Sequence, residues 1–311
     1  MHIISHGGSS RAAKRLLALG LTLLLALCAA HAQAAPINLT DSLGRPVSLN
    51  APATRVVALT PGDCEILYAI DAEDTLVGRG AYCDQPSQVL SIPAVQTGTD
   101  TNLEQIIALG PQVLLMPTMG QTPEQVAALE AAGITVAISD AHDIAGVYGT
   151  IALIGALTGR EAQATALIQS MRDTFDGLAQ NAQGQAPKTV YFEVSPLAFG
   201  LWTAGQGTFM HEVAGLLGLT NAFADLSGWA EISQEQVIAR NPDVIVTIAM
   251  VPAEGPTPQQ EIASRAGWTG ITAVRNGAIL CLPNDELSRP GPRLAEGAQV
   301  LYSFVYGPQT D

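Results

Sequence analysis

Residues 104–115 of this chain, EQIIALGPQVLL, reappear as residues 235–246, EQVIARNPDVIV. In each copy a capping residue, Asn102 or Ser233, stands three positions before a glutamine, a pattern that satisfies free backbone amides at a helix start. Each predicted helix stops before a proline, and the apolar run that follows is typical of a buried strand. The repeat therefore predicts two similar α/β halves with a surface glutamate at the same place on each. This arrangement suits a protein that holds something between two lobes and presents both lobes to a partner.

Strands and helices alternate on both sides of the repeat. This alternation predicts βα units and parallel sheets. In the first half the expected strands are residues 55–59, 75–78, 113–116 and 135–138, and the expected helices are residues 64–70 and 123–132. In the second half the expected strands are residues 189–194 and 278–282, and the expected helices are residues 209–217 and 292–306, with Pro292 at the first position of the last helix.

A long helical stretch separates the two halves. Residues 142–181 have helical periodicity with one clear break, at residues 157–160. Thr158 is a candidate cap for a second helix, which would join the halves as a rigid spine rather than as a flexible linker. The alternative is a pair of helices packed within the first half. The corresponding divisions are an N-terminal lobe at 35–157, an interlobe helix at 158–183 and a C-terminal lobe at 184–311.

The first 34 residues are typical of an export signal. A basic region, an apolar stretch at residues 16–30 and a small-residue site at residues 32–34 follow one another. The apolar stretch is shorter than the roughly 20 residues that a membrane-spanning helix needs. We expect cleavage near Ala34 and a soluble protein in the periplasm or another extracytoplasmic space. Lipidation at Cys28 is the alternative, with Leu27 where such signals carry a small residue.

The chain is acidic, with a net charge of −14. Loss of the export signal removes basic residues and no acidic ones, so the mature protein is more acidic still. Such a surface repels nucleic acid and acidic membranes, which excludes both as expected partners.

Three cysteines follow the export signal. Cys64 comes after the first predicted strand and Cys83 after the second, so both should lie at one end of a parallel sheet. They are candidates for a disulfide in an oxidising compartment, and Cys281 is expected to be a buried thiol.

Motifs of catalysis and metal binding are absent. The chain has no Gly-x-Ser-x-Gly elbow, P-loop, HExxH or glycine-rich dinucleotide turn. Only His142 and His211 follow the export signal, fewer imidazoles than a protein that captures a bare metal ion usually offers. We interpret His211 as structural or solvated. We therefore expect no enzyme activity, no catalytic residues, no metal site and no cofactor.

Aromatic residues gather in segments that should follow the strands. They include Tyr82 in the first half and Trp202 and Trp229 in the second. Ligands of parallel-sheet proteins sit beyond the carboxyl ends of the strands. Aromatic faces with a few polar groups suit a large, flat, partly apolar ligand. Core packing is the alternative for any one of these rings taken alone.

From about Val56 to its end, the chain resembles the periplasmic substrate-binding proteins of ABC importers for vitamin B12, ferric siderophores and haem. The likeness is greatest to the cobalamin-binding branch, in which a tryptophan stands where this chain has residues 98–101. The motifs in matching order are Thr60-Pro61…Glu65, Tyr82…Asp84…Pro86, Asn102-Leu103-Glu104, Trp229 followed by Ser233-Gln234-Glu235-Gln236-Val237, and Arg289…Pro292-Arg293.

This resemblance implies a class III periplasmic binding protein of the helical-backbone metal-receptor type. In that fold two Rossmann-like α/β lobes with parallel sheets are joined by one long rigid helix. The resemblance also implies that Tyr82 and Trp229 pack against a corrin ring. We expect Trp202 in the second half to compensate for the tryptophan that the first half lacks. Asp285 and Arg289 would hydrogen-bond the amide periphery of the ligand.

Two glutamates have an implied partner. By resemblance, Glu104 and Glu235 dock onto arginines of a membrane permease. Exposed charge pairs contribute little stability but fix orientation and speed encounter. The alternative is that each glutamate only favours its helix dipole. The protein is expected to act as a monomer.

The leading prediction is a solute-binding protein that captures a cobalt corrinoid and delivers it without chemical change. The first alternative is a ferric-siderophore or haem binder with the same fold. Tyr82 would then be the candidate haem ligand, and Arg79, Arg289 and Arg293 the candidate partners of siderophore anions. An enzyme that modifies a corrinoid and a sensor that signals without import are the alternatives from other classes.

Overall fold

The computed structural model describes residues 36–98, 100–248, 255–282 and 286–307. The predicted export signal with Cys28, and the predicted ligand residue Asp285, lie outside the described residues. In the described ranges, no helix combines the length and the apolar character needed to cross a bilayer.

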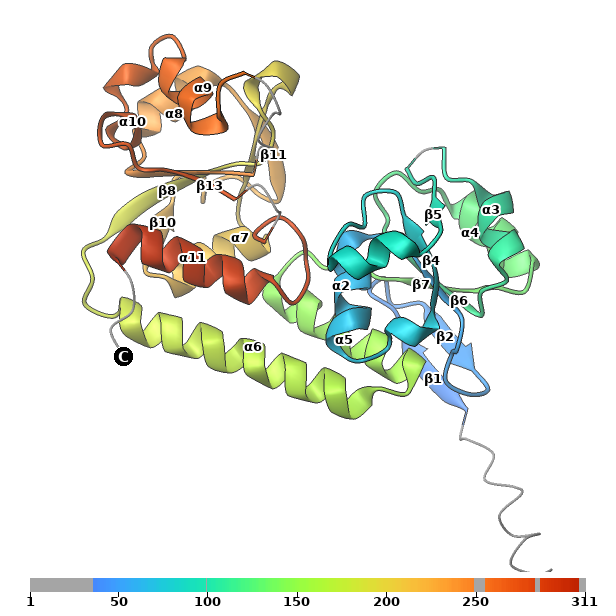
Figure 1. Ribbon diagram of the computed structural model, residues 1–311. Coiled ribbons are helices and arrows are strands. Elements are labelled where there is room, and N and C mark those ends of the chain that lie inside the picture. Colours follow the sequence, from blue (N-terminus) through green and yellow to red (C-terminus); the bar gives the residue numbers. More distant parts are fainter. Residues whose placement is uncertain (1–35, 99, 249–254, 283–285, 308–311) are drawn as a thin grey trace, which may run out of the picture. The chain divides into compact units, whose positions relative to one another are not determined.

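Two parallel sheets form the centres of the two lobes (Figure 1). Their strands are short and mostly buried, as in parallel sheets covered by helices. The N-terminal sheet has the order β5-β4-β3-β6-β7, from β3 (Val56–Ala58), β4 (Leu76–Gly80), β5 (Ala94–Val95), β6 (Val113–Met116) and β7 (Thr135–Ile138). The C-terminal sheet has the order β10-β8-β12-β13, from β8 (Lys188–Glu193), β10 (Leu219–Asn221), β12 (Val244–Thr247) and β13 (Ile279–Cys281). These sheets confirm the predicted α/β architecture.

Helices connect the strands in both lobes. The N-terminal lobe has α2 (Pro61–Ala69), α3 (Leu103–Leu109), α4 (Pro123–Ala131) and α5 (Ile144–Thr158). The C-terminal lobe has α7 (Phe209–Leu216), α8 (Gln234–Arg240), α9 (Pro258–Ser264), α10 (Thr272–Arg275) and α11 (Leu294–Tyr306). Short 3₁₀ turns lie at Glu73–Thr75, Ser87–Ser91, Leu197–Phe199 and Trp268–Gly270. The last helix begins at Leu294, two residues later than predicted. Its N-cap residue is Arg293, so Pro292 lies before the helix and is not its first residue.

Two antiparallel strand pairs were not predicted from the sequence. The first joins β1 (Ile37–Thr40) to β2 (Pro46–Leu49). The second joins β9 (Leu201–Ala204) to β11 (Trp229–Ile232). The helix α7 and the strand β10 lie between these two strands in the chain. The partners in this second pair are far apart in the chain, so local sequence patterns do not reveal it.

The helix α6 (Glu161–Ala182) is the longest in the described residues and packs against both lobes. It contacts α5 on one side and α7 and α11 on the other (Figure 1). Buried side chains such as Ile151, Phe175 and Leu301 make one apolar core that is continuous through α5, α6 and α11. This packing is that of a spine rather than a flexible linker. The exact domain boundaries at residues 157 and 183 stay predictions.

The predicted cap of this helix was wrong. Thr158 is the last residue of α5, and its hydroxyl donates a hydrogen bond to the Ile154 carbonyl oxygen at 2.7 Å. Gly159, at φ +68°, ends α5 in the left-handed conformation that glycine adopts without steric cost. The N-cap of α6 is therefore Arg160.

The repeated segments fold alike. The side chains of Asn102 and Ser233 cap α3 and α8 by accepting a backbone hydrogen bond three residues on. Both helices end at a residue in the left-handed conformation, Gly110 or Asn241. A fully buried strand follows each helix. The two lobes thus use the same local scaffold, as the repeat predicts.

Candidate functional site

The strand pair β9–β11 presents two tryptophans on one face. Trp202 lies opposite Glu231 in the register, and Trp229 lies opposite Ala204. Residues opposite one another across an antiparallel pair point to the same side, so both indoles share a face with Glu231. Each tryptophan is 39% exposed, whereas Leu201 and Ile232 on the other face are buried. The pair therefore offers two aromatic rings to solvent on a backbone ribbon.

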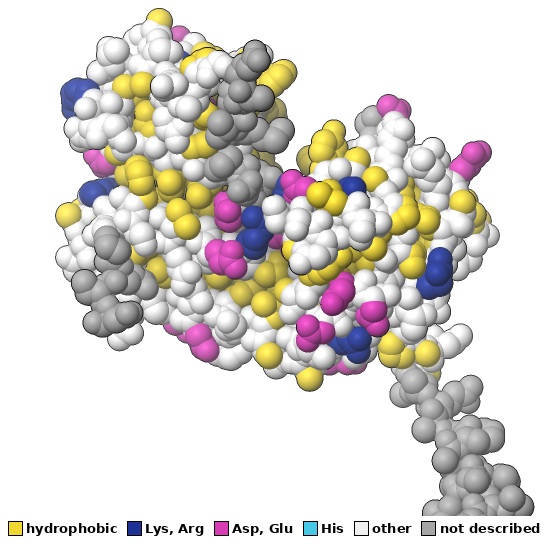
Figure 2. Space-filling view, viewed as in Figure 1, with side chains coloured by type: hydrophobic (Ala, Val, Ile, Leu, Met, Phe, Trp, Pro, Cys, Tyr) yellow, Lys and Arg dark blue, Asp and Glu magenta, His cyan; other side chains and the backbone are white. Residues whose placement is uncertain are grey.

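The predicted aromatic residue of the N-terminal lobe, Tyr82, follows β4 in a loop that an arginine organises. The buried Arg79 guanidinium donates hydrogen bonds to the carbonyl oxygens of Gly80, Ala81 and Cys83 at 3.2, 3.4 and 3.0 Å. Tyr82 projects from this loop and is 76% exposed. We call Tyr82, Trp202 and Trp229 the aromatic site. Figure 2 shows hydrophobic side chains bordering the hollow between the two lobes.

An ion-pair cluster links the lobes beside this loop. Arg289 donates to Asp84 at 2.6 Å and to Glu65 at 3.3 Å. Arg293 donates to both carboxylate oxygens of Glu65, at 2.8 and 3.0 Å. This bond raises the pKa of the Arg293 guanidinium. We call these four residues the interlobe cluster, and Figure 2 shows basic and acidic side chains meeting between the lobes.

The backbone also brings the lobes together at this place. A Cβ added to Gly62 in α2 would lie 2.7 Å from the carbonyl oxygen of Pro290. Only glycine allows so close an approach. Pro290 lies between Arg289 and Arg293 in sequence, so the close approach fixes the segment that carries both arginines.

A buried acid lies at the start of α2. The Asp63 carboxylate accepts a hydrogen bond from the Ser139 hydroxyl at 2.7 Å, and its backbone amide donates to the Thr60 hydroxyl oxygen at 3.1 Å. Burial raises the pKa of Asp63 from 3.8 to about 7, against the opposing effect of these hydroxyl groups. The acid is therefore partly protonated near neutral pH. Sequence reasoning did not single it out, since burial is not visible in a local pattern.

The predicted disulfide is absent from the structure. Cys64 and Cys83 are free, fully buried thiols. They do lie at the same end of the sheet, because both sulfurs approach the carbonyl oxygen of Ala58, at 3.9 and 4.0 Å. Contact with the neighbouring Cys83 thiol and burial both raise the pKa of Cys64, which keeps its sulfur protonated and poorly reactive. Cys281 is a half-buried thiol rather than a fully buried one.

The predicted docking glutamates are exposed on matched helix faces. Glu104 in α3 and Glu235 in α8 are followed by the same alternation of exposed and buried residues. Within the described part of the chain neither forms an ion pair. A hydrogen bond with the Ser233 side chain lowers the pKa of Glu235, so that carboxylate is charged at neutral pH. Two exposed glutamates thus occupy equivalent positions on the two lobes.

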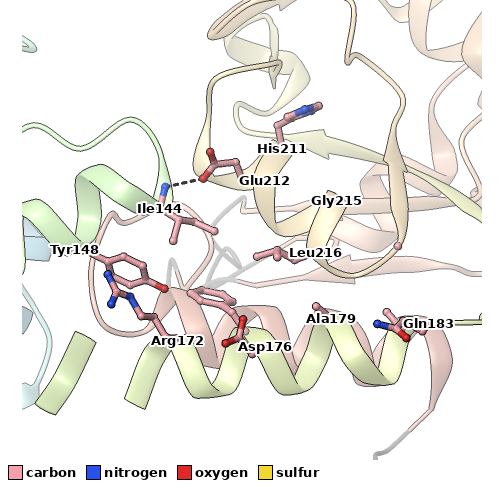
Figure 3. Close-up of a pocket in the computed structure, with 13 residues that line it drawn as sticks. Ile144, Tyr148, Arg172, Asp176, Ala179, Gln183, His211, Glu212, Gly215 and Leu216 are labelled. Carbon is pink, nitrogen blue, oxygen red and sulfur yellow. Dashed lines mark hydrogen bonds between the residues drawn. The ribbon is translucent and has the colours of Figure 1, made fainter. Parts of the chain in front are cut away.

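A separate cavity of about 890 Å³ lies between α5, α6 and α7 (Figure 3). Arg172 stacks on Tyr148, with 5.0 Å between the guanidinium carbon and the ring centroid. A carboxylate oxygen of Glu212 accepts a hydrogen bond from the Ile144 amide at 2.7 Å. The half-buried His211 also lines this cavity. No predicted ligand residue lines the cavity. Sequence reasoning missed it because α7 closes it against α5 and α6 only in the folded protein.

The described residues contain no candidate metal site. Among those residues, no group of three or more His, Cys, Asp or Glu side chains is placed to hold a metal ion.

Residues 56–286 match a protein family that is described as "Periplasmic binding protein". The chain belongs to this family. It is 31% identical over 277 residues to YvrC of Bacillus subtilis, an uncharacterised ABC transporter substrate-binding lipoprotein, covering 87% of this chain and 86% of that protein. It is 34% identical over 267 residues to the vitamin B12-binding protein of Salmonella typhi, covering 82% and 91%.

Solved structures agree with this assignment. The periplasmic vitamin B12-binding protein BtuF of Vibrio cholerae has a TM-score of 0.69 at 27% identity, with 82% of this chain and 97% of that chain covered. A structure from an Fe³⁺-hydroxamate transport system of Saccharomonospora viridis has a TM-score of 0.74 at 23% identity, covering 88% and 99%, and shows the fold alone. The predicted family and the two-lobed class III fold are confirmed. The family consists of binding proteins for transport rather than enzymes.

Proposed function

We propose that this binding protein captures a corrinoid between its lobes and delivers it to the permease of an ABC importer. The observation that carries the proposal is the pair of tryptophans on one exposed face of β9–β11. Stacking and edge contacts with aromatic rings suit a large flat macrocycle. Tyr82 would close on the ligand from the other lobe, since its loop is tied to the C-terminal lobe through Asp84 and Arg289.

The charges of the site favour a corrinoid over an anionic chelate. The arginines expected to meet siderophore anions are Arg79, Arg289 and Arg293. Arg79 bonds loop carbonyl oxygens, and the other two bond Glu65 and Asp84. An anionic ligand would have to displace these partners. A corrinoid periphery rich in neutral amides would not.

A haem binder is the second candidate, and one observation favours it. Tyr82 is 76% exposed, and a tyrosine that is accessible in this way could supply its phenol oxygen to haem iron. Haem propionates, however, would meet the same neutralised arginines as siderophore anions would. A ferric siderophore has the weaker support of the two.

Delivery rests on the matched glutamates. Glu104 and Glu235 would meet basic residues of the permease and orient the two lobes on it. The protein would work as a monomer outside the cytoplasm, after cleavage near Ala34. Lipidation at Cys28 is the alternative form of export, and the relative YvrC is a lipoprotein.

The experiment is a calorimetric titration of the purified protein with cyanocobalamin, cobinamide, a ferric hydroxamate, a ferric catecholate and haemin. We expect sub-micromolar binding of a corrinoid and its loss in Trp229→Ala. The control is Phe304→Ala, because Phe304 on α11 is equally exposed, at 40%, and lies outside the aromatic site. Tight binding of haemin or a ferric chelate without a corrinoid signal would overturn the ligand assignment.

A further inference from the structure

The first residue of α7 supports one of the two exposed tryptophans. The rings of Phe209 and Trp229 meet edge to face, with 5.5 Å between their centroids and 65° between their planes. Phe209 is 2% exposed, whereas Trp229 is 39% exposed. A buried ring therefore backs an indole that is partly open to solvent. Because aromatic pairs favour this geometry, the contact favours one orientation of Trp229.

The helix α7 that carries Phe209 is fastened to the start of α5 by two hydrogen bonds. The Phe209 amide donates to the carbonyl oxygen of His142 at 2.8 Å. The Ile144 amide donates to a carboxylate oxygen of Glu212 at 2.7 Å, and Figure 3 shows these two groups facing each other. Phe209 and Ile144 are the first residues of α7 and α5. First-turn amides have no partner within their own helix, so here the chain of each helix satisfies the first amide of the other.

Of these two hydrogen bonds, only the one to Glu212 is made by a side chain and can be removed by substitution. Its acceptor is a carboxylate and its donor lies at the positive end of α5, which makes it a charge-assisted hydrogen bond. Glu212 stands three residues after Phe209, so the two side chains are neighbours on one side of α7. Loss of this carboxylate would therefore loosen the turn of α7 that sets the Phe209 ring against Trp229.

We propose that Phe209 is a positioning residue for Trp229 and that Glu212 acts through it by holding α7 against α5. The ligand then meets a tryptophan whose orientation is set before binding, which lowers the entropic cost of binding. A tryptophan that is free to turn would bind the same ring more weakly. This inference rests on the proposed function, because it concerns a ring that meets the ligand.

The first test reads the position of Trp229 without any ligand. The chain has three tryptophans and Trp268 is fully buried, so Trp229 is the one exposed indole in a Trp202→Phe background. Acrylamide quenching and fluorescence anisotropy then report its accessibility and its motion. We expect Phe209→Leu, which keeps an apolar side chain in the core, to raise the quenching and lower the anisotropy. Unchanged values of both would overturn the proposal.

The role of Glu212 is tested by a pair of variants in the same background. Glu212→Ala removes the acceptor of the Ile144 amide, whereas the side-chain oxygen in Glu212→Gln can still accept that hydrogen bond. We expect Glu212→Ala to change the Trp229 signals in the same direction as Phe209→Leu, and Glu212→Gln to resemble the background protein. Glu212→Ala with unchanged signals would overturn the role of Glu212.

A matched control separates positioning from a general loss of packing. Phe175 on α6 is a buried ring of the same apolar core as Phe209. Phe175→Leu should lower the free energy of unfolding, measured in urea, and leave the Trp229 signals unchanged. Changes in the control as large as those in Phe209→Leu would overturn the proposal, since any loosened core would then release Trp229.

The second test is the affinity for cobinamide, measured by calorimetry with Trp202 in place. We expect Phe209→Leu to weaken binding about tenfold, as for the loss of one aromatic pair, and Phe175→Leu by about twofold at most. Wild-type affinity in Phe209→Leu would overturn the proposal. If the wild type binds no corrinoid, the proposed function fails, and the quenching of Trp229 still decides whether Phe209 positions it.

Discussion

The two lobes share a scaffold but stabilise buried acids in different ways. In the C-terminal lobe the buried Glu193 receives two hydrogen bonds from Arg265, at 2.6 and 3.0 Å. In the N-terminal lobe the buried Asp63 has the Ser139 hydroxyl as its side-chain donor. Glu193 is therefore held by an arginine, whereas Asp63 is held by a neutral hydroxyl group and its charge depends on pH. The repeated segments have the same backbone structure in both lobes, whereas the partners of these two buried carboxylates differ.

The largest effect should come from breaking the buried pair of the C-terminal lobe. Arg265→Met would leave Glu193 buried without its cation, and burial already raises the pKa of that carboxyl despite Arg265. We expect a loss of about 3–5 kcal/mol in the free energy of unfolding, as for other broken buried pairs. Guanidinium denaturation measures it. Arg240→Met, at a more exposed pair with Asp225, should cost only about 1 kcal/mol. Similar losses in the two variants would contradict the contrast.

The second effect concerns pH and the N-terminal lobe. The pKa of Asp63 is about 7 in the folded protein against 3.8 in the reference state, so the folded form binds its proton more tightly. Its contribution to stability is full below about pH 4 and is lost as pH rises through about 7. Asp63→Asn should remove this dependence and be more stable than wild type at pH 8, by on the order of 2–4 kcal/mol. Urea denaturation between pH 5 and 8 is the measurement. Parallel pH profiles for the two proteins would show that Asp63 titrates normally.

The third prediction compares how much each lobe contributes to the affinity for the ligand. Trp202 and Trp229 share one face, whereas Tyr82 stands alone on its loop. Trp229→Ala should weaken corrinoid binding by about 2 kcal/mol, or roughly thirtyfold, and Tyr82→Ala by less. Calorimetric titration of both variants gives the ranking. A larger loss from Tyr82→Ala would place the main contact on the N-terminal lobe.

The fourth effect uses the matched glutamates. Because Glu104 and Glu235 occupy equivalent helix positions, Glu104→Ala and Glu235→Ala should weaken permease binding by similar amounts, about 1 kcal/mol each. Binding to permease in lipid nanodiscs is the readout. Glu124→Ala is the control, since Glu124 is an exposed first-turn glutamate of α4 outside the repeat. An equal effect in the control would mean that overall charge, rather than docking, is measured.

The smallest effect tests the repeat itself. Asn102→Ala and Ser233→Ala each remove the side-chain cap of an equivalent helix. Each should lower the free energy of unfolding by about 1 kcal/mol. Thermal unfolding of the two variants measures the loss. Unequal losses would show that the tertiary surroundings of α3 and α8 differ more than their local geometry.

The parts that the sequence predicted are those with local signals. The strands at Val113–Met116 and Thr135–Ile138 have the predicted bounds, because caps, prolines and apolar runs mark them directly. Pairings between distant segments were missed, as in the ribbon that carries both tryptophans. The Thr158 cap was wrong because the preceding helix includes Thr158 and ends at Gly159, so that Arg160 is the residue before the next helix.

The sequence predicted the kind of ligand site better than it predicted how the residues of the site are arranged. Aromatic residues at strand ends indicated an apolar ligand surface, and the structure exposes Tyr82, Trp202 and Trp229. The role of Arg289 could not be read in the same way. Its carboxylate partners, Glu65 and Asp84, lie more than two hundred residues earlier in the chain. No spacing rule connects such groups, and only the folded lobes show that they meet.

The most direct test of the central claim is a crystal structure of the protein with cobinamide. We predict a corrin ring packed against Trp229 and Tyr82, with Arg289 still bound to Asp84. A corrin ring in the cavity between α5, α6 and α7, or no bound corrinoid at saturating concentration, would contradict the account.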